Sequence, residues 1–285
     1  MQINTEELKL IPVFGIAGNF AEHLNQAGEA ADFINVITEE KNAPKGIFPI
    51  YIPQSESFVG TFPLSHTQID ADFTGTVNLH MEPEMCVLFN VVYAAEQVTS
   101  IEPIAFSAFN DCSIRKPNAK KISEKKNWGS SCTGIAKQWF DIDQFQKGGV
   151  LDNIHINSYL RRDNKVIQYG VDSPVIGYQY FYSKLVNWII KTLNTQADFG
   201  PLENLQDFLQ QLKQPKKIII SLGATRYTAF GETGFLKLGD QVGVFVYDSK
   251  QITENDIEAF FVANKSADLF MGGAALIQSV QHVKR

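Results

Sequence analysis

Short strand-like runs of apolar residues outnumber the stretches with helical spacing along this chain. The strand-like runs are residues 48–53, 77–93, 101–111, 216–223 and 241–248, together with a hairpin over 153–170. The hairpin turn is expected at Arg162-Asp163-Asn164. The runs at 77–93 and 101–111 are rich in Val, Leu, Ile and Phe and carry carboxylates at one end.

Helical spacing occurs in five stretches. They are residues 18–37, entered through Asn19; a helix opened by Ser173 as N-cap and Pro174 at the first position; 204–214, stopped by Pro215; 253–262; and 268–282. Strands and helices do not alternate regularly. The order therefore predicts an α+β protein built around irregular β sheets.

Composition narrows the class of protein. The 285 residues carry a net charge of −6, and the densest basic run, Lys116 to Lys126, is too short to track a phosphate backbone, so we expect no nucleic-acid binding. Three widely spaced cysteines form no CxxC pair and suit a reducing compartment. No stretch approaches the ~20 apolar residues of a membrane helix, and the N-terminus has acids where a signal peptide has bases. We expect a cytoplasmic protein without a membrane partner.

The most distinctive local feature is His80-Met81-Glu82-Pro83-Glu84. In an extended chain alternate side chains share a face, so Glu82 and Glu84 project together. Asp111 closes the other apolar segment and would supply a third oxygen. An all-carboxylate set suits Mg²⁺ or Mn²⁺ before Zn²⁺. The alternative is that the two glutamates belong to a solvated strand face.

The surrounding motifs, read in order from about residue 14 to 246, resemble the fumarylacetoacetate hydrolase superfamily. GNFAEH (18–23) is similar to its GRNYxxH opening, FPIYIP to its FxKP strand, and NLHMEPEM to its HxExE metal motif. FNDCSIRKPN (109–118) is similar to the segment with the third metal carboxylate, an Arg and an amide residue. Lys126-Asn127-Trp128-Gly129 resembles the K-x-F motif, and GFLKLGDQVGVFV (234–246) the FLxxGDxV strand.

This resemblance implies mixed, rolled β sheets with peripheral helices, in one catalytic domain over 1–285 with a helical insertion at 197–215. It implies a homodimer that acts on a small oxo-carboxylic acid in catabolism. The reaction would be hydrolysis of a carbon–carbon bond in an acylpyruvate-like or dioxo acid, with decarboxylation or isomerisation and hydration left open.

The same resemblance implies roles for individual residues. Glu82, Glu84 and Asp111 would hold Mg²⁺ or Mn²⁺, Lys126 would stabilise an oxyanion, and His23 would be the general base. The substrate would contact residues of two segments, namely Gly223, Thr225, Arg226 and Asn118. For His23 the alternative is a satisfied polar residue, and for Lys126 it is a shift to Lys125.

Several positions depart from the family pattern. Gly18 replaces an Arg, and Gln26 replaces the Glu that pairs with the histidine, while Glu29 lies one turn further on. The TGTPxGVG strand end becomes LGATRY (222–227), where Arg226 is either a carboxylate clamp or a surface residue. A catalytically silent member that binds a carboxylate metabolite or a protein partner therefore stays open as a second hypothesis.

Overall fold

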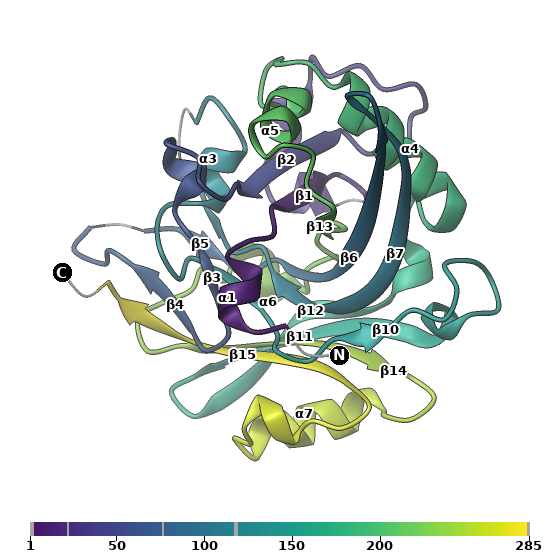
Figure 1. The fold of residues 1–285 in the computed structure, drawn as a ribbon. Coiled ribbons are helices and arrows are strands. Elements are labelled where there is room, and N and C mark those ends of the chain that lie inside the picture. The colour runs from purple at the N-terminus through teal and green to yellow at the C-terminus, as the bar shows by residue number, and fades with distance from the viewer. Residues whose placement is uncertain (1–2, 22, 76, 117–118, 284–285) are drawn as a thin grey trace.

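A computed structural model describes residues 3–21, 23–75, 77–116 and 119–283. The described strands form a larger sheet, a smaller sheet and a two-stranded ladder (Figure 1). The larger sheet runs in the order β2 (Gly46–Tyr51), β1 (Val13–Ala17), β13 (Lys217–Ser221), β6 (Pro83–Ala94), β7 (Gln97–Asn110), β9 (Thr133–Ile135) and β3 (Leu64–Ser65), and β10 (Phe140–Asp141) also pairs with β7. The smaller sheet runs in the order β12 (Lys165–Pro174), β11 (Ile154–Arg162), β14 (Gln241–Asp248), β15 (Gly273–His282) and β4 (Gln68–Ala71). The ladder pairs β5 (Leu79–His80) with β8 (Ser113–Ile114).

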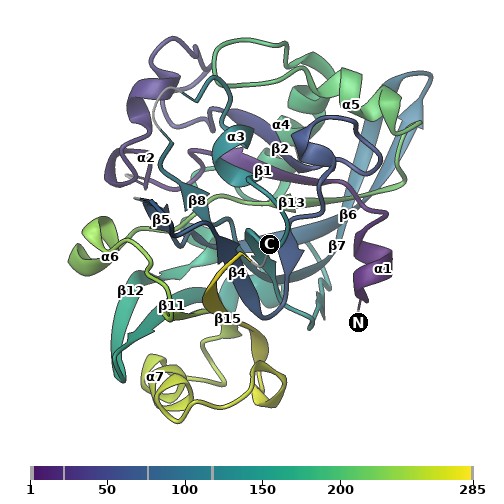
Figure 2. The ribbon, with the colours of Figure 1, turned by 90° about the vertical axis from the view of Figure 1, so that its left-hand side faces the viewer.

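Helices lie around these sheets (Figure 2). The α-helices are α1 (Thr5–Leu8), α2 (His23–Gln26), α3 (Ser123–Lys126), α4 (Tyr182–Thr195), α5 (Leu205–Gln211), α6 (Ala229–Thr233) and α7 (Glu254–Val262). The 3₁₀ turns are η1 (Ala30–Phe33), η2 (Phe58–Gly60), η3 (Val150–Asn153), η4 (Val175–Gly177) and η5 (Ala267–Leu269). The predicted α+β class with mixed, curled sheets is confirmed. No helix among the described residues is long and apolar enough to cross a membrane.

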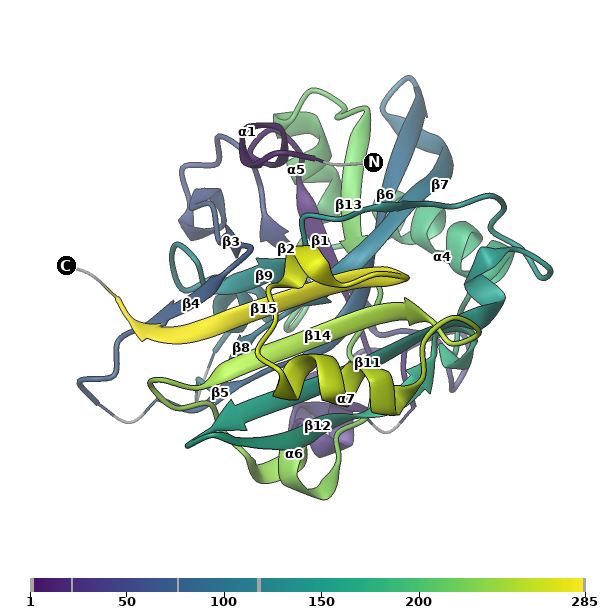
Figure 3. The same cartoon turned by 90° about the horizontal axis from the view of Figure 1, so that it is seen from below.

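Strand β6 explains why residues 85–89 are apolar without alternation. Val87 and Phe89 belong to the core where β6 and β7 pack against the smaller sheet. Cys86 and Leu88 point the other way, into a second core that also includes Phe48 of β2. A strand covered on both faces is apolar at every position. Figure 3 shows the smaller sheet from its outer side, where Phe261 of α7 packs on Tyr159 and Phe245.

The hairpin over 153–170 is confirmed as β11 and β12. Asp163 and Asn164 form its turn with φ of 49° and 63°, the left-handed values that a two-residue turn of this kind requires. The strands at 216–223 and 241–248 are confirmed as β13 and β14, and the helices at 204–214 and 253–262 as α5 and α7.

The helix predicted over 18–37 is wrong in its extent. The chain instead forms a turn, the short α2 and the 3₁₀ turn η1. Gly18 and Gly28 have φ of +73° and +71°, which interrupts right-handed helix at both positions. His23, Glu29 and Phe33 are buried, whereas Ile34 and Ile37 are exposed, so only some positions of this segment pack inward.

The helix predicted to begin at Ser173 starts at Tyr182 instead. Ser173 and Pro174 are the last residues of β12, and the Ser173 hydroxyl donates to the Val171 carbonyl rather than capping a helix. Phe181, the N-cap of α4, makes no side-chain capping bond. Pairing of Ser173 and Pro174 with β11 outweighs the local Ser-Pro signal, and the position of β12 at the edge of its sheet tolerates a proline.

The helix predicted over 268–282 is also wrong, since Gly273–His282 form β15. This strand pairs antiparallel with β14 and parallel with β4. Pro83 is the first residue of β6, inside the larger sheet, and lies between Glu82 and Glu84 in the chain. The first position of a strand tolerates the missing proline N–H.

Candidate metal centre

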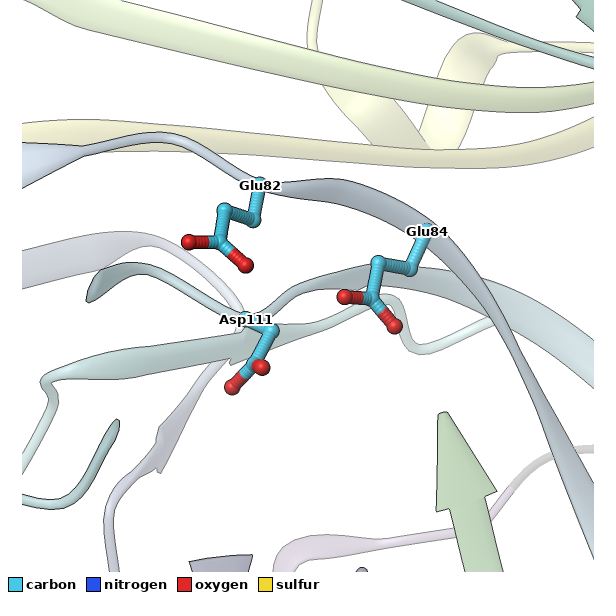
Figure 4. A group of neighbouring side chains, drawn as sticks. All are labelled: Glu82, Glu84 and Asp111. Carbon is cyan, nitrogen blue, oxygen red and sulfur yellow. The ribbon is translucent and has the colours of Figure 1, made fainter. Parts of the chain in front are cut away.

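Glu82 and Glu84 enter the protein interior from the beginning of β6. Both side chains point to the face that carries Cys86 and Leu88 further along the strand, and both are at most 3% exposed. Figure 4 shows the two carboxylates side by side below β6, with Asp111 beside them. The alternative of a solvated strand face is therefore wrong.

Asp111 reaches the same point because β6 and β7 are antiparallel. Pro83 at the start of β6 pairs with Asn110 at the end of β7, and the Asp111 N–H donates to the Glu82 carbonyl at 3.0 Å. One oxygen from each of Glu82, Glu84 and Asp111 lies within 4.8 Å of the others. Sheet register thus joins the two carboxylates at the beginning of β6 with a third that lies 27 residues after Glu84 in the chain.

Lys126, at the end of α3, lies between two of these carboxylates. Its Nζ is 2.6 Å from Glu82 Oε2 and 2.8 Å from Asp111 Oδ2, and the side chain is 2% exposed. Lys125 instead pairs with Asp32 and Glu29. The structure thus brings Lys126, rather than its neighbour, to the carboxylates.

Glu84 is held from the opposite side by the end of β13. The Ser221 hydroxyl and the Gly223 N–H both donate to Glu84 Oε2, the latter at 2.9 Å. Gly223 has φ of +107°, and a Cβ there would lie 3.2 Å from the Ile16 carbonyl oxygen. Glycine thus allows the backbone to approach the carboxylate closely.

His23 lies on α2 directly over the site. Its Nδ1 is 2.9 Å from the carbonyl of Thr225, and its Nε2 is 3.7 Å from Glu82 Oε2. Because a carbonyl only accepts, Nδ1 carries the proton in this contact and Nε2 keeps its lone pair in the neutral ring. Gln26 fixes the same contact, since it exchanges two hydrogen bonds with the backbone of Tyr227.

Arg115 is the main site residue to which the sequence assigned no role. Its guanidinium lies 2.6 Å from Glu29 Oε1 and 3.1 Å from Glu82 Oε1, and it contacts His80 Nδ1 at 2.8 Å. Glu29 therefore pairs with Arg115 rather than reaching back to His23. The available signals were the Arg of the FNDCSIRKPN motif and the position of Glu29 one turn after Gln26.

Burial and charge shift the ionisation of this cluster. Burial raises the pKa of Glu84 well above its ordinary value, and the Asp111 carboxylate raises it further. Burial also raises the pKa of Asp111 to about 7, against the opposite effect of Lys126. For Glu82 burial acts in the same direction, but Lys126 and Arg115 outweigh it and lower the pKa well below its ordinary value.

Burial acts on the pKa values of the basic partners in the opposite sense. Burial alone lowers the pKa of Lys126, but the carboxylates of Asp111 and Glu82 outweigh it and raise that pKa. Burial and the neighbouring Arg115 lower the pKa of His80 to about 3, so His80 is neutral and accepts from Arg115. His80 thus orients Arg115.

Two observations test whether a cation fits this group of carboxylates. Asp111 Oδ1 is buried and has no hydrogen-bond partner among the described residues. The carboxylates and Lys126 line a cavity of about 20 Å³, and room for one water needs at least ~10–15 Å³. A buried, unpartnered carboxylate oxygen beside such a space fits a hard cation.

The predicted substrate-binding residues divide into three groups. Gly223 and the buried Thr225 lie at the site through the contacts described above. The Arg226 side chain is exposed, and its carbonyl accepts from the Val171 N–H. Asn118 lies outside the described residues.

The remaining histidines contact groups other than the three carboxylates of the site. His66 contacts the Ile135 carbonyl, His155 pairs with Asp172, and His282 accepts from the Phe73 N–H. The three cysteines are free and buried, as a reducing compartment allows; they are Cys86, Cys112 and Cys132.

Fold and site together define a class: an α+β protein with a buried triad of carboxylates and a lysine. The profile described as "Family of unknown function (DUF5718)" matches residues 29–280, so the chain belongs to that family. No curated protein matches the sequence.

Solved structures resemble the fold at low sequence identity. The 5-carboxymethyl-2-hydroxymuconate delta-isomerase from Mycobacterium smegmatis is 13% identical with a TM-score of 0.53, over 96% of this chain and 80% of that one. A 2-keto-3-deoxy-D-arabinonate dehydratase complexed with magnesium and 2,5-dioxopentanoate is 13% identical with a TM-score of 0.53, over 100% and 83%. The maleylpyruvate hydrolase from Sphingobium sp. SYK-6 is 8% identical with a TM-score of 0.51, over 95% and 71%. At these identities the likeness concerns the fold, which is that of fumarylacetoacetate hydrolase-like enzymes.

Proposed function

We propose that this protein is a divalent-cation-dependent enzyme that cleaves a carbon–carbon bond of a small oxo-carboxylic acid. The observation that carries the proposal is Asp111 Oδ1, a buried carboxylate oxygen without a hydrogen-bond partner beside Glu82 and Glu84. The names of the structural relatives, which include a hydrolase of maleylpyruvate and a dehydratase, favour oxo acids as the substrate class. In this proposal the protein is a cytoplasmic homodimer.

Glu82, Glu84 and Asp111 would hold Mg²⁺ or Mn²⁺, because carboxylate oxygens are the ligands these hard cations prefer. When bound, such a cation acts as a Lewis acid toward the ketone and carboxylate oxygens of an oxo acid. The raised pKa values of Glu84 and Asp111 indicate that their negative charges are not fully compensated, and a bound cation would supply the missing positive charge.

Lys126 would stabilise the negative charge that develops on the substrate. Its ammonium is buried and lines the cavity beside the carboxylates. In such a water-poor place a fixed charge stabilises a developing oxyanion more than it would in water. The pair of electrons released by the broken carbon–carbon bond would move onto the ketone oxygen of the substrate.

His23 would handle the proton. With Nδ1–H directed to the Thr225 carbonyl, Nε2 faces the site with its lone pair free and has no hydrogen-bond partner among the described residues. Nε2 would take a proton from the water that attacks the acyl carbonyl, and it would return that proton to the carbon atom left by the departing acid. One product would then be a carboxylic acid, formed from the acyl group, and the other would be an oxo acid.

Metal binding is the first test. We expect calorimetry with Mn²⁺ to show one site, and the variants Glu82→Gln and Glu84→Gln to weaken it at least about a hundredfold, because each loses a charged ligand. Glu56→Gln, on the surface, is the control. Unchanged Mn²⁺ affinity in both site variants would exclude this metal centre.

Turnover separates the enzyme from the catalytically silent alternative. That alternative has one favourable observation, since the Lys126 ammonium already neutralises part of the carboxylate charge. We expect the Mg²⁺ form to turn over at least one acylpyruvate or oxaloacetate in a screen, and His23→Gln to lower kcat by a factor of about 10² to 10⁴. Metal binding without turnover of any oxo acid would favour the silent alternative.

A further inference from the structure

Lys45 lies next to a residue that lines the carboxylate cavity, Gly18. Lys45 directly precedes β2, and its N–H donates to the Ala17 carbonyl at 2.8 Å. The register of β1 and β2 pairs Gly46 with Ala17, so Lys45 lies alongside Gly18. Gly18 is the first residue of the segment that passes over the carboxylates, and it lines their cavity.

Gly18 makes room for the lysine side chain. A Cβ built at Gly18 would lie 3.1 Å from Lys45 Cγ and 2.8 Å from Leu24 Cδ1. The Lys45 stem therefore packs along the Gly18 backbone. Long lysine side chains commonly bury the stem in this way and leave the charged end accessible.

A second, larger cavity adjoins the carboxylate cavity at this place. It has a volume of about 360 Å³ and is lined by Lys41 and Lys45. The two cavities share three wall residues, namely Gly18, Phe20 and Leu24. The carboxylate cavity alone, at about 20 Å³, is too small for an organic acid, whereas ligand pockets typically have volumes of ~300–1,000 Å³.

Lys45 is half-buried and has no carboxylate within ion-pair distance in the part of the chain that the structure describes. Nearby lysines differ, because Lys184 pairs with Glu40 and Lys191 with Glu39. A half-buried ammonium without a counterion attracts an anion more strongly than an exposed one. The large cavity therefore contains an unused positive charge next to the reactive centre.

Building on the proposed function, we propose that the substrate is a dianion, an oxo acid with a second carboxylate, and that Lys45 binds this distal carboxylate. The keto and proximal carboxylate oxygens would lie at Glu82, Glu84 and Asp111. The carbon chain would pass Gly18 beside Phe20 and Leu24, the residues that line both cavities. Lys45 is then the residue that distinguishes diacids from monoacids.

The experiment is calorimetric binding to the Mg²⁺-loaded protein with ligands matched in carbon number. The pairs are 2-oxoglutarate with 2-oxopentanoate and 2-oxoadipate with 2-oxohexanoate, and oxalate is the ligand for the metal alone. We expect the diacid of at least one pair to bind about tenfold tighter than its monoacid. Lys45→Met should reduce that preference to below about twofold and leave oxalate affinity unchanged.

Two variants serve as controls. Lys45→Arg keeps the charge and should keep most of the preference, and Lys41→Met, at the exposed lysine of the same cavity, should keep all of it. Equal affinity for both members of each pair, or a full preference in Lys45→Met, overturns the assignment while oxalate binding leaves the metal site standing. Failure of oxalate to bind the Mg²⁺ form overturns the proposed function and the Lys45 site with it.

Discussion

Arg115 contacts Glu29, Glu82 and His80 at once. Its charge compensates two carboxylates that are each about 3% exposed. Removing one partner of a buried charge pair is costly because it leaves the other charge without compensation. At the residue scale the site is therefore a network of ion pairs. Through Glu29 and Arg115, the segment that follows Gly18 is connected to Glu82.

Another buried carboxyl group, that of Glu203, gives a stability prediction. Burial raises its pKa from the ordinary 4.5 to about 7, against the effect of the Ser123 hydroxyl that donates to it. Between about pH 4.5 and 7 Glu203 is therefore protonated more in the folded protein than in the unfolded chain, and its contribution to the free energy of unfolding falls as the pH rises.

We expect Glu203→Gln to gain stability relative to the native protein across this interval. The stability gained by Glu203→Gln should be about 1–3 kcal/mol larger at pH 8 than at pH 4.5, because each pKa unit corresponds to ~1.4 kcal/mol. Urea unfolding at several pH values measures it. Glu56→Gln, at an exposed position, should show no such trend. A difference between Glu203→Gln and the native protein that is constant with pH would contradict the assigned shift.

At the element scale, β15 is the clearest difference between sequence pattern and structure. Apolar residues at 270, 274, 276 and 277 are compatible with helical spacing. In the structure Leu276 and Val280 point into the core between the sheets, while β14 and β4 take up the backbone hydrogen bonds. The apolar spacing of this segment is thus compatible with a helix, but pairing with β14 on one side and β4 on the other makes it a strand.

Replacing Gly273 by Ala distinguishes a strand from a helix at this position, because the change in stability has opposite signs in the two. In β15 an added Cβ would lie 2.4 Å from the Val246 carbonyl oxygen and 2.7 Å from Tyr247 Cα. We expect Gly273→Ala to destabilise by about 2 kcal/mol or more, since backbone atoms have to shift. In a helix the same change would stabilise by roughly 0.5–1 kcal/mol.

Chemical unfolding of the variant gives the sign directly. Gly75→Ala is the matched control, because no atom lies within 4 Å of its added Cβ and it has no left-handed φ. We expect this control to be close to neutral. A stabilised Gly273→Ala protein would contradict the strand.

At the scale of the whole molecule, the proposed cation would lie where three neighbouring strands of the larger sheet, β13, β6 and β7, meet. Its ligands come from β6 and the end of β7, and Gly223 after β13 holds Glu84. A ligand that binds only the folded protein stabilises it, by about 2.7 kcal/mol at one hundred times its Kd.

We therefore expect Mg²⁺ or Mn²⁺ to raise the Tm by several degrees over the value in EDTA, measured by calorimetry at constant ionic strength. Glu84→Gln should lose this increase, whereas Lys45→Met should keep it, because Lys45 is not a ligand. An equal increase in Glu84→Gln would mean that the cation acts elsewhere on the protein.

The sequence by itself determined a large part of this protein. Alternation placed Glu82 and Glu84 on one face, the turn at Asp163-Asn164 fixed the β11–β12 hairpin, and the ordered motifs indicated Asp111 and Lys126. These features depend on local geometry or on a short motif. The α+β class followed from the order of strand-like and helical runs.

Tertiary structure decided what depends on contacts between distant segments. It placed Arg115 between Glu29 and Glu82, directed Arg226 outward, and turned 268–282 into a strand. It also decided that Glu82, Glu84 and Asp111 are buried together. The reason is physical: register across β6 and β7 and burial between the sheets outweigh local propensity, and neither can be read from neighbours in the sequence.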